Sequence, residues 1–261
     1  MKCTDQNYTY VRGLVIILSL FLLAIFISCN DGGGGGDSND QASTGDPDLT
    51  ILEGTWFGTM IDDADLVYTI RVTFDNEGNL VVDSVDGNPV GDTATLTKIT
   101  SRMFRMLDSN NIEGMVVVDA QGLHLGWMDE ADNAGVLQKN AAQLPVFDVS
   151  DINEQWFGEG FWCDADMNLL LDDLQSDMTV NDLTFSVQDN YNTDINGGFI
   201  TWLPDYGAWR GRYNPNALGE SGSFTVLLTV DKNFAASFSI DNENGPGICP
   251  QDYRYRFLSR Q

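Results

Sequence analysis

A stretch of strict two-residue alternation is the feature that most limits the folds open to this chain. Over residues 66–75, one set of side chains is apolar at every second position, and the intervening set is mostly polar. A period of two is typical of a β-strand with one buried face and does not fit a helix. Turn residues at 76–79 and a second apolar stretch at 80–85 follow, which predicts a β-hairpin. Antiparallel strands are therefore expected from the start of the folded region.

Short strands continue through the first half of the chain. They are predicted at 56–61, 93–100, 103–107, 115–119, 123–128 and 136–137. Strands at such close spacing suit an antiparallel meander closed into a small barrel. About eight short strands enclose an interior that side chains can fill, so we expect no ligand cavity inside this first barrel.

The second half of the chain begins like the first. Trp156-Phe157-Gly158 repeats Trp56-Phe57-Gly58. Alternating strands are again predicted at 183–188, 224–230, 234–240 and 253–257. The sequence therefore predicts an all-β fold of two tandem small antiparallel β-barrels or meanders, and a single larger β structure built from both halves is the alternative.

An insertion distinguishes the second half. Residues 163–180 have no counterpart in the first half, and Leu170, Leu174 and Met178 lie four residues apart. That spacing predicts a short helix, with Asp166 as its N-cap. The expected division is a first β domain at 48–140, a linker at 141–150 and a second β domain at 151–261. The insertion leads us to expect that the second barrel is open at one end.

Gly54-Thr55-Trp56, at the start of the first strand of a meander, resembles the Gly-x-Trp start of the calycin superfamily, the lipocalin-like barrels. The resemblance implies that the Trp plugs one end of the barrel and that a basic residue of the last strand packs across it. In the second half, Glu154 stands where the Gly should be. The basic residues available for this role are Lys139 in the first half and Arg254 or Arg256 in the second.

The N-terminal region carries a targeting signal. An apolar run at 14–27 follows Lys2 and Arg12 and ends at Ser28-Cys29. The run is short of the about 20 residues needed to cross a bilayer, and its layout is typical of a secretory signal peptide at residues 1–28. Its end resembles the lipobox of bacterial lipoproteins, which implies a lipid on Cys29. An uncleaved N-terminal anchor helix is the alternative.

Residues 29–47 are rich in Gly and Asp and contain almost no apolar side chains. Such a segment buries too little surface to offset its ordering entropy, so a flexible tether is expected. By resemblance to lipoproteins, Asn30 after the lipidated Cys implies sorting to the outer membrane. We therefore expect an exported protein, lipid-anchored to the bacterial outer membrane, that faces the periplasm or the outside.

Charge narrows the range of partners. The chain has 13 basic and 39 acidic residues and a net charge of −26. The acidic residues are spread evenly, which favours solubility and argues against nucleic acid or adsorption on anionic lipid. Outside the signal region and Cys29, the cysteines are Cys163 and Cys249. An even pair in an exported domain predicts one disulfide.

One aromatic stretch is a candidate ligand site. Flat rings with arginines beside them, in a segment rich in Gly and Pro, suit stacking on sugar rings or on a partner protein. The candidate residues are Trp202, Tyr206, Trp209, Arg210, Arg212 and Tyr213. The alternative is that Trp202 and Trp209 are core residues on either side of a turn.

Cofactor signals are sparse. Asn192, Asp194 and Asn196 resemble the start of a calcium loop, but Leu203 stands where the bidentate acid is needed. We expect an ordinary polar turn and no cofactor, with a loop-borne Ca²⁺ left open. His124 is the one histidine of the chain, which excludes an imidazole metal cluster and disfavours a Ser-His-Asp triad.

These observations favour a non-enzymatic, membrane-anchored binding module. Its partner would be a small molecule, a glycan or an envelope protein. A structural or assembly role in the envelope is the first alternative. A hydrolase that uses acidic residues is the second, because carboxylates are abundant and two of them can lie at catalytic spacing.

Overall fold

The computed structural model describes residues 49–62, 64–129, 131, 133–163, 169–189, 195–213, 222–240 and 254–260. These residues belong to one compact unit. The predicted signal peptide, the tether, Cys29 and Cys249 lie outside the described residues. Because Cys249 is one of its two cysteines, the predicted disulfide stays a prediction. Among the described residues, no helix is long and apolar enough to span a membrane.

The first half folds into a closed antiparallel barrel of eight strands. The sheet closes because β2 pairs with β3 as well as with β1, and β1 pairs with β9. A two-residue strand, β4 (Asn88–Pro89), extends the edge at β3. The barrel strands are β1 (Gly54–Ile61), β2 (Val67–Phe74), β3 (Asn79–Val85), β5 (Thr93–Lys98), β6 (Met103–Asp108), β7 (Glu113–Val118), β8 (His124–Asp129) and β9 (Ala134–Lys139).

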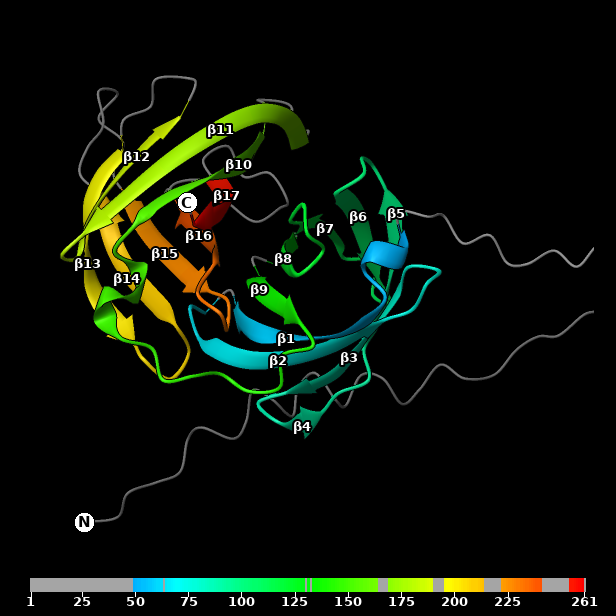
Figure 1. The fold of residues 1–261 in the computed structure, drawn as a ribbon. Helices are drawn as coiled ribbons and strands as arrows, with labels where there is room; N and C mark the ends of the chain where they lie inside the picture. The colour runs from blue at the N-terminus through cyan, green and yellow to red at the C-terminus, as the bar shows by residue number, and fades with distance from the viewer. Residues whose placement is uncertain are drawn as a thin grey trace, which may run out of the picture. The chain divides into compact units, whose positions relative to one another are not determined.

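The second half folds into another closed antiparallel barrel, in which each strand pairs with the next and β10 pairs with β17 (Figure 1). Its strands are β10 (Gln155–Cys163), β11 (Leu169–Asn181), β12 (Thr184–Asp189), β13 (Ile195–Leu203), β14 (Ala208–Tyr213), β15 (Gly222–Leu228), β16 (Phe234–Ile240) and β17 (Arg254–Arg260). The prediction of an all-β fold with two antiparallel barrels is confirmed.

The predicted helical insertion is wrong. Residues 169–181 form strand β11, which pairs along β10 and β12. A spacing of four residues is a multiple of the two-residue strand period as well as close to one helical turn, so this spacing alone does not distinguish a strand from a helix. Pairing on both sides of β11 decides in favour of the strand. Residues 164–168, with the predicted cap Asp166, lie outside the described residues.

Apolar side chains fill the interior of each barrel. The first interior is packed around the fully buried Trp56, Phe74 and Phe104. The second is packed around Trp156 and Trp209. Phe147, from the predicted linker, is buried in the second interior as well, which ties that segment to the second barrel.

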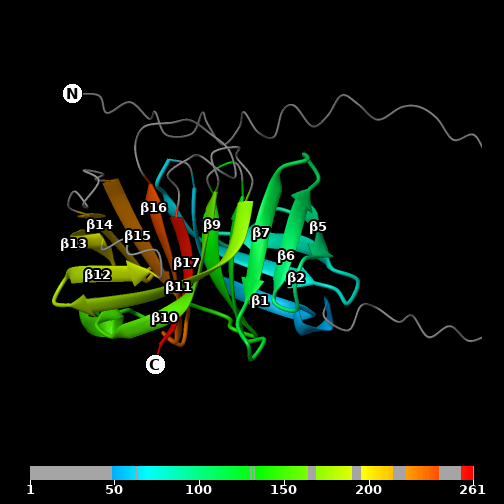
Figure 2. The same ribbon diagram turned by 90° about the horizontal axis from the view of Figure 1, so that it is seen from above.

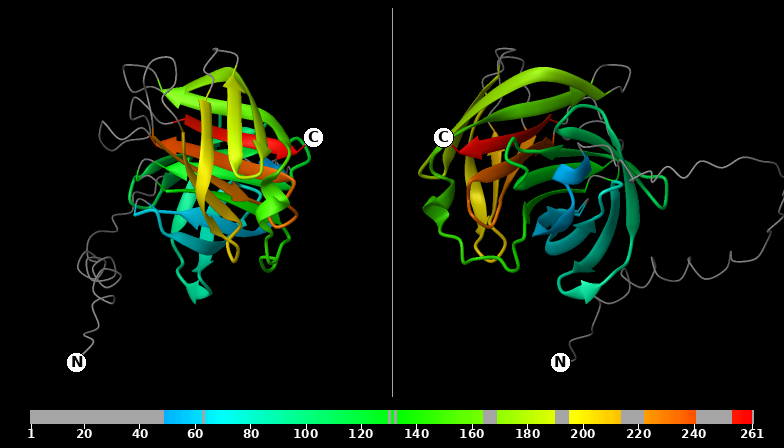
Figure 3. Two further views of the ribbon diagram at one scale, coloured as in Figure 1. Left: turned by 90° about the vertical axis from the view of Figure 1, so that its left-hand side faces the viewer. Right: turned by 45° about the vertical axis from the view of Figure 1, so that its right-hand side comes forward.

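A third apolar cluster lies between the barrels. Its side chains come mostly from β7, β8 and β9 and from β15, β16 and β17, which are the sixth to eighth strands of their barrels. β16 and β17 accordingly lie beside β8 and β9 (Figure 2), and Figure 3 shows the two barrels from two further sides. The strands of this interface are apolar on both faces, because Val116 and Val118 point into the first barrel and Met115 and Val117 point toward the second.

Each barrel is closed at one end by the same arrangement of a Trp and a basic residue. Trp56 donates its indole N–H to the Leu52 carbonyl at 2.7 Å, and Lys139 Nζ lies 5.5 Å from the Trp56 ring centre. Lys139 Nζ also donates to the Ile51 carbonyl at 2.9 Å. The acceptors in the two barrels lie in, or directly after, the short 3₁₀ helices Leu49–Ile51 and Val149–Ile152.

In the second barrel, Trp156 donates to the Ile152 carbonyl at 3.0 Å, and Arg260 lies over its ring at 5.4 Å. Arg260 Nη2 donates to the Asp151 carbonyl at 3.0 Å. The choice of Arg254 or Arg256 for this role was therefore wrong. Arg260 takes the role because the register pairs it with Trp156, in the same way that Lys139 pairs with Trp56.

Candidate functional site

Two equivalent hairpins meet at the interface between the barrels. One joins β7 to β8 and the other joins β15 to β16. In the first, Asp119 N–H donates to the His124 carbonyl at 2.9 Å, and in the second, Thr229 N–H donates to the Phe234 carbonyl at 2.9 Å. Both turns also have one residue with a left-handed backbone, at φ +68° for Gly122 and +64° for Lys232. His124 and Phe234 are therefore the same position of a repeated unit.

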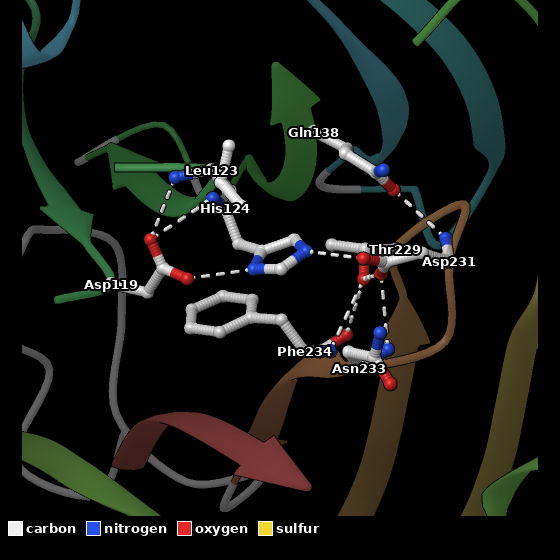
Figure 4. A network of polar contacts seen from close by, with 8 residues as sticks. All are labelled: Asp119, Leu123, His124, Gln138, Thr229, Asp231, Asn233 and Phe234. Atoms are coloured by element: carbon white, nitrogen blue, oxygen red, sulfur yellow. Dashed lines mark hydrogen bonds and ion pairs between the residues drawn. The ribbon is translucent and has the colours of Figure 1, made fainter. Parts of the chain in front are cut away.

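His124 links the two barrels through both of its ring nitrogens (Figure 4). Nδ1 lies 2.7 Å from Asp119 Oδ2 of its own hairpin, and Nε2 lies 2.8 Å from Asp231 Oδ2 of the other barrel. The histidine and Asp119 are buried, with side-chain exposures of 9% and 5%, while Asp231 is 31% exposed. Because each nitrogen faces a carboxylate, the doubly protonated imidazolium satisfies both contacts at once.

The charges of the three groups support one another. Burial opposes the charged form of His124, but the hydrogen bonds and charges of Asp119 and Asp231 outweigh it and raise the histidine pKa. Burial likewise opposes ionisation of both carboxyls. Hydrogen bonds from His124 and from backbone amides outweigh that effect and lower the pKa of Asp119 and of Asp231. The three shifts and the contact geometry thus all favour the charged forms, an imidazolium between two carboxylates.

Further hydrogen bonds hold both carboxylates in place. Asp119 Oδ1 accepts from the backbone N–H groups of Leu123 and His124 at 2.8 and 3.2 Å. Asp231 Oδ1 accepts from the Thr229 hydroxyl at 3.0 Å, and the Asp231 N–H donates to Gln138 Oε1 at 2.8 Å. The second hairpin is therefore fixed to β9 of the first barrel.

A column of parallel rings runs through this interface. His124 stacks on Phe234 at a centroid distance of 5.7 Å with 8° between the planes. Phe234 in turn stacks on Phe257 at 6.4 Å and 10°. Gly126 lets Phe257 approach the first barrel, because a Cβ at Gly126 would lie 1.9 Å from two carbons of that ring.

A pocket of about 480 Å³ opens beside the bridge, between the two barrels. The three residues of the column line it, together with Phe157 of β10 and the aliphatic residues Val117 and Leu123. Its charged lining residues are Arg102, Asp119, His124, Asp231 and Arg260. The volume is in the range of small-molecule sites, and an apolar wall with a few convergent polar groups is typical of them.

The aromatic residues of the predicted ligand site belong to two different apolar clusters. Trp202 and Trp209 are paired across β13 and β14, on either side of a tight turn. Trp209 is fully buried in the second barrel and Trp202 packs against the same cluster, so the alternative reading as core residues describes them. Tyr206 packs against the cluster between the barrels.

The two arginines of that stretch lie in different environments. Arg210 Nη2 donates to the Asp65 carbonyl in the β1–β2 turn of the first barrel, and Arg212 is exposed. None of these residues lines the pocket, and the side chain of Tyr213 lies outside the described residues.

The candidate calcium segment is only partly described. Asn196 is exposed on β13, and Asn192 and Asp194 lie outside the described residues. In the part of the chain that is described, no group of three His, Cys, Asp or Glu side chains could hold a metal ion.

No protein-family model and no curated protein matches this chain. One solved structure similar to it is the crystal structure of a protein with unknown function from the DUF3598 family, from Nostoc punctiforme PCC 73102. The two share 12% sequence identity, the match covers 82% of this chain and 98% of that chain, and the TM-score is 0.28. The function has to be argued from the site itself.

Sequence reasoning examined His124 only as a metal ligand or a triad member and missed the bridge. The sequence held no signal for it, because residues 118–124 and 228–234 have no identical residue at equivalent positions and only the shared hairpin geometry puts His124 opposite Phe234.

Proposed function

We propose that this chain is an exported, lipid-anchored protein that binds a small molecule in the pocket between its two barrels. The observation that carries the proposal is the pocket of about 480 Å³ with the His124 bridge in its wall. The membrane anchor at Cys29 and the outer-membrane location rest on the N-terminal sequence. The lipocalin-like assignment rests on the Gly-x-Trp start and is supported by the Trp–basic closure of both barrels.

The barrel interiors are poor candidates for the ligand site. In lipid- and cofactor-carrying barrels the ligand lies inside, but here bulky side chains such as Trp56, Phe104 and Trp209 occupy both interiors. Eight short strands leave little room beyond those side chains. The space between the barrels is lined by both halves, so it exists only because the two barrels are joined.

The same geometry favours binding over hydrolysis. A pair of acidic residues that works as acid and base needs one carboxyl with a raised pKa. His124 instead lowers the pKa of both Asp119 and Asp231. The pKa of Asp129 is raised by its burial, but this carboxylate caps its own turn by accepting from Ala131 and Asn133 and does not line the pocket.

Native mass spectrometry of the full chain, purified after expression with its own signal, tests the binding function. We expect a discrete extra mass that disappears on unfolding. The variant Ser259→Gln, which narrows the pocket, should lack this mass. The variant Thr97→Gln, at an exposed position of β5 outside the pocket, should keep it. A bare polypeptide mass for the unaltered chain would contradict a tightly held ligand.

The anchor is tested separately. Replacing Cys29 by Ser should release the protein from the membrane fraction, because this Cys is the proposed lipid attachment site. Unchanged membrane association would favour the uncleaved anchor helix instead, and would leave the binding proposal intact.

A further inference from the structure

We infer that the pocket between the barrels selects a planar aromatic acid, with its ring along the column of rings and its carboxylate toward the arginines. This inference rests on the proposed function and names the ligand class for that site. The inference depends on the origin of the pocket, on the aromatic residues in its lining and on its charged lining residues.

The pocket exists because the two halves differ at one pair of equivalent positions. Gln138 precedes Lys139 on β9, and Ser259 precedes Arg260 on β17, so the two are equivalent through the Trp–basic closure. Gln138 fills its side of the interface by accepting from Asp231 N–H at 2.8 Å. The shorter Ser259 cannot reach the opposite hairpin and instead lines the pocket.

A second difference leaves an aromatic face at the pocket. Phe57 and Phe157 are equivalent in the repeated Trp-Phe-Gly, and in the first barrel Arg71 lies over the Phe57 ring at 5.1 Å. The strand partner of Phe157 is Asp177 rather than an arginine. Phe157 lines the pocket, so one half has a covered ring where the other half offers a ring to a ligand.

The column of rings in the pocket lining favours a flat ligand. His124, Phe234 and Phe257 are stacked with their planes within 8° and 10° of one another, and all three line the pocket. Aromatic groups prefer offset-stacked or edge contacts with such rings. A planar aromatic ligand can make such contacts with the rings of the lining, which an aliphatic ligand does not offer.

The charges favour an anion. The lining has three cationic groups, Arg102, Arg260 and the His124 imidazolium, and two carboxylates, both already bound to His124. A cationic balance stands out in a chain with a net charge of −26. Arg260 Nη2 donates to the Asp151 carbonyl at 3.0 Å and lies 3.6 Å from Glu154 Oε1, and both partners lie outside the pocket lining, so the guanidinium is held in the pocket wall. Arginine donors bind carboxylates in preference to neutral acceptors.

Isothermal titration calorimetry of the full chain, stripped of bound ligand, with two matched probes tests this inference. The probes are 2-naphthoate and its neutral counterpart 2-naphthamide, which share one flat ring system. We expect one 2-naphthoate per chain, bound on the order of tenfold more tightly than 2-naphthamide because of the charge-assisted bonds. Arg102→Gln should abolish this preference with little effect on the amide. Arg105→Gln, on the exposed face of β6, is the matched control and should leave both affinities unchanged.

The outcomes separate the ligand class from the binding function. Equal affinities for the two probes, both lost in Ser259→Gln, would overturn the acid preference and leave the pocket as the binding site. Binding of 2-naphthoate that survives Ser259→Gln would place it elsewhere and overturn the inference. Failure of 2-naphthoate to bind at all would also overturn it, while an extra mass in the native spectrum would still support the proposed function.

Discussion

His124 and Phe234 occupy the same position in two copies of one hairpin, and their rings stack on each other across the interface between the barrels. One copy has a charged ring between two carboxylates, and the other has an apolar ring that supports it. The repeat thus brings into contact two chemically different residues from one equivalent position. The stability of the interface and its response to pH both follow from this pair.

Replacing His124 by Gln should destabilise the protein by about 2–3 kcal/mol. The change removes the cation between two partly or fully buried carboxylates, and an uncompensated buried charge is costly. Urea unfolding followed by tryptophan fluorescence measures the loss. Arg105→Gln, which breaks the exposed pair with Glu113, is the control and should cost at most about 0.5 kcal/mol. A His124→Gln protein as stable as the unaltered one would show that the bridge contributes nothing.

The contribution of the bridge should depend on pH in a defined way. The folded-state pKa of His124 is raised, so its share is complete below the ordinary value of 6.5 and is lost as the pH rises through the folded-state pKa. The pKa values of Asp119 and Asp231 are lowered, so their share is complete above the ordinary value of 3.8 and is lost as the pH falls through the folded-state values. The difference in unfolding free energy between the unaltered chain and His124→Gln should therefore be largest between pH 3.8 and 6.5.

Urea titrations of both proteins from about pH 3 to 9 measure that difference. A difference that stays constant across this range would mean that His124 acts through packing on Phe234 rather than through its charge.

Gly126→Ala should weaken the contact between the barrels by about 1–3 kcal/mol. The added methyl would overlap the Phe257 ring, and overpacking of a filled interface forces side chains or backbone to shift. Gly198→Ala is the matched control, because it is also a strand glycine and its new methyl would meet its nearest neighbour at an ordinary 3.4 Å. Phe257→Leu in the Gly126→Ala background should recover part of the loss. If Phe257→Leu adds its own full cost instead, the two sites do not interact.

Lys139→Met should lower the unfolding free energy by about 1–2 kcal/mol. The variant loses the cation above Trp56 and the hydrogen bond to the Ile51 carbonyl, while it keeps most of the aliphatic stem. Lys98→Met, at an exposed position of β5, is the control. Thermal unfolding of both variants provides the comparison, and equal midpoints would argue against a stabilising role for the Trp–basic closure.

The sequence predicted those parts of the fold that depend on local pattern. The alternation at 66–75 marks β2, and the turn after it marks the hairpin with β3. The Trp–basic closure was predicted in kind but assigned to Arg254 or Arg256. The last strand was predicted to end at Phe257, whereas β17 continues to Arg260, and only the register with β10 identifies the residue above Trp156.

The bridge and the pocket could not be predicted in the same way. Asp231 lies 107 residues from His124, and nothing local to either residue indicates that the two barrels bring them together. The apolar residues on both faces of β7, such as Met115 and Val116, were the local sign that this strand is covered on its outer side as well. That pattern points to an interface without saying what occupies it.

The difference between Gln138 and Ser259, at equivalent positions of the two barrels, has a consequence for how the sequence of such a protein can evolve. Two identical barrels related by a symmetry axis would have the same groove twice, and any substitution that opened one would open the other and weaken the whole assembly. In a single covalent chain, one groove can stay closed by Gln138 and hold the halves together. The other is then free to accumulate substitutions that adapt it to a new ligand, without loss of the attachment between the barrels.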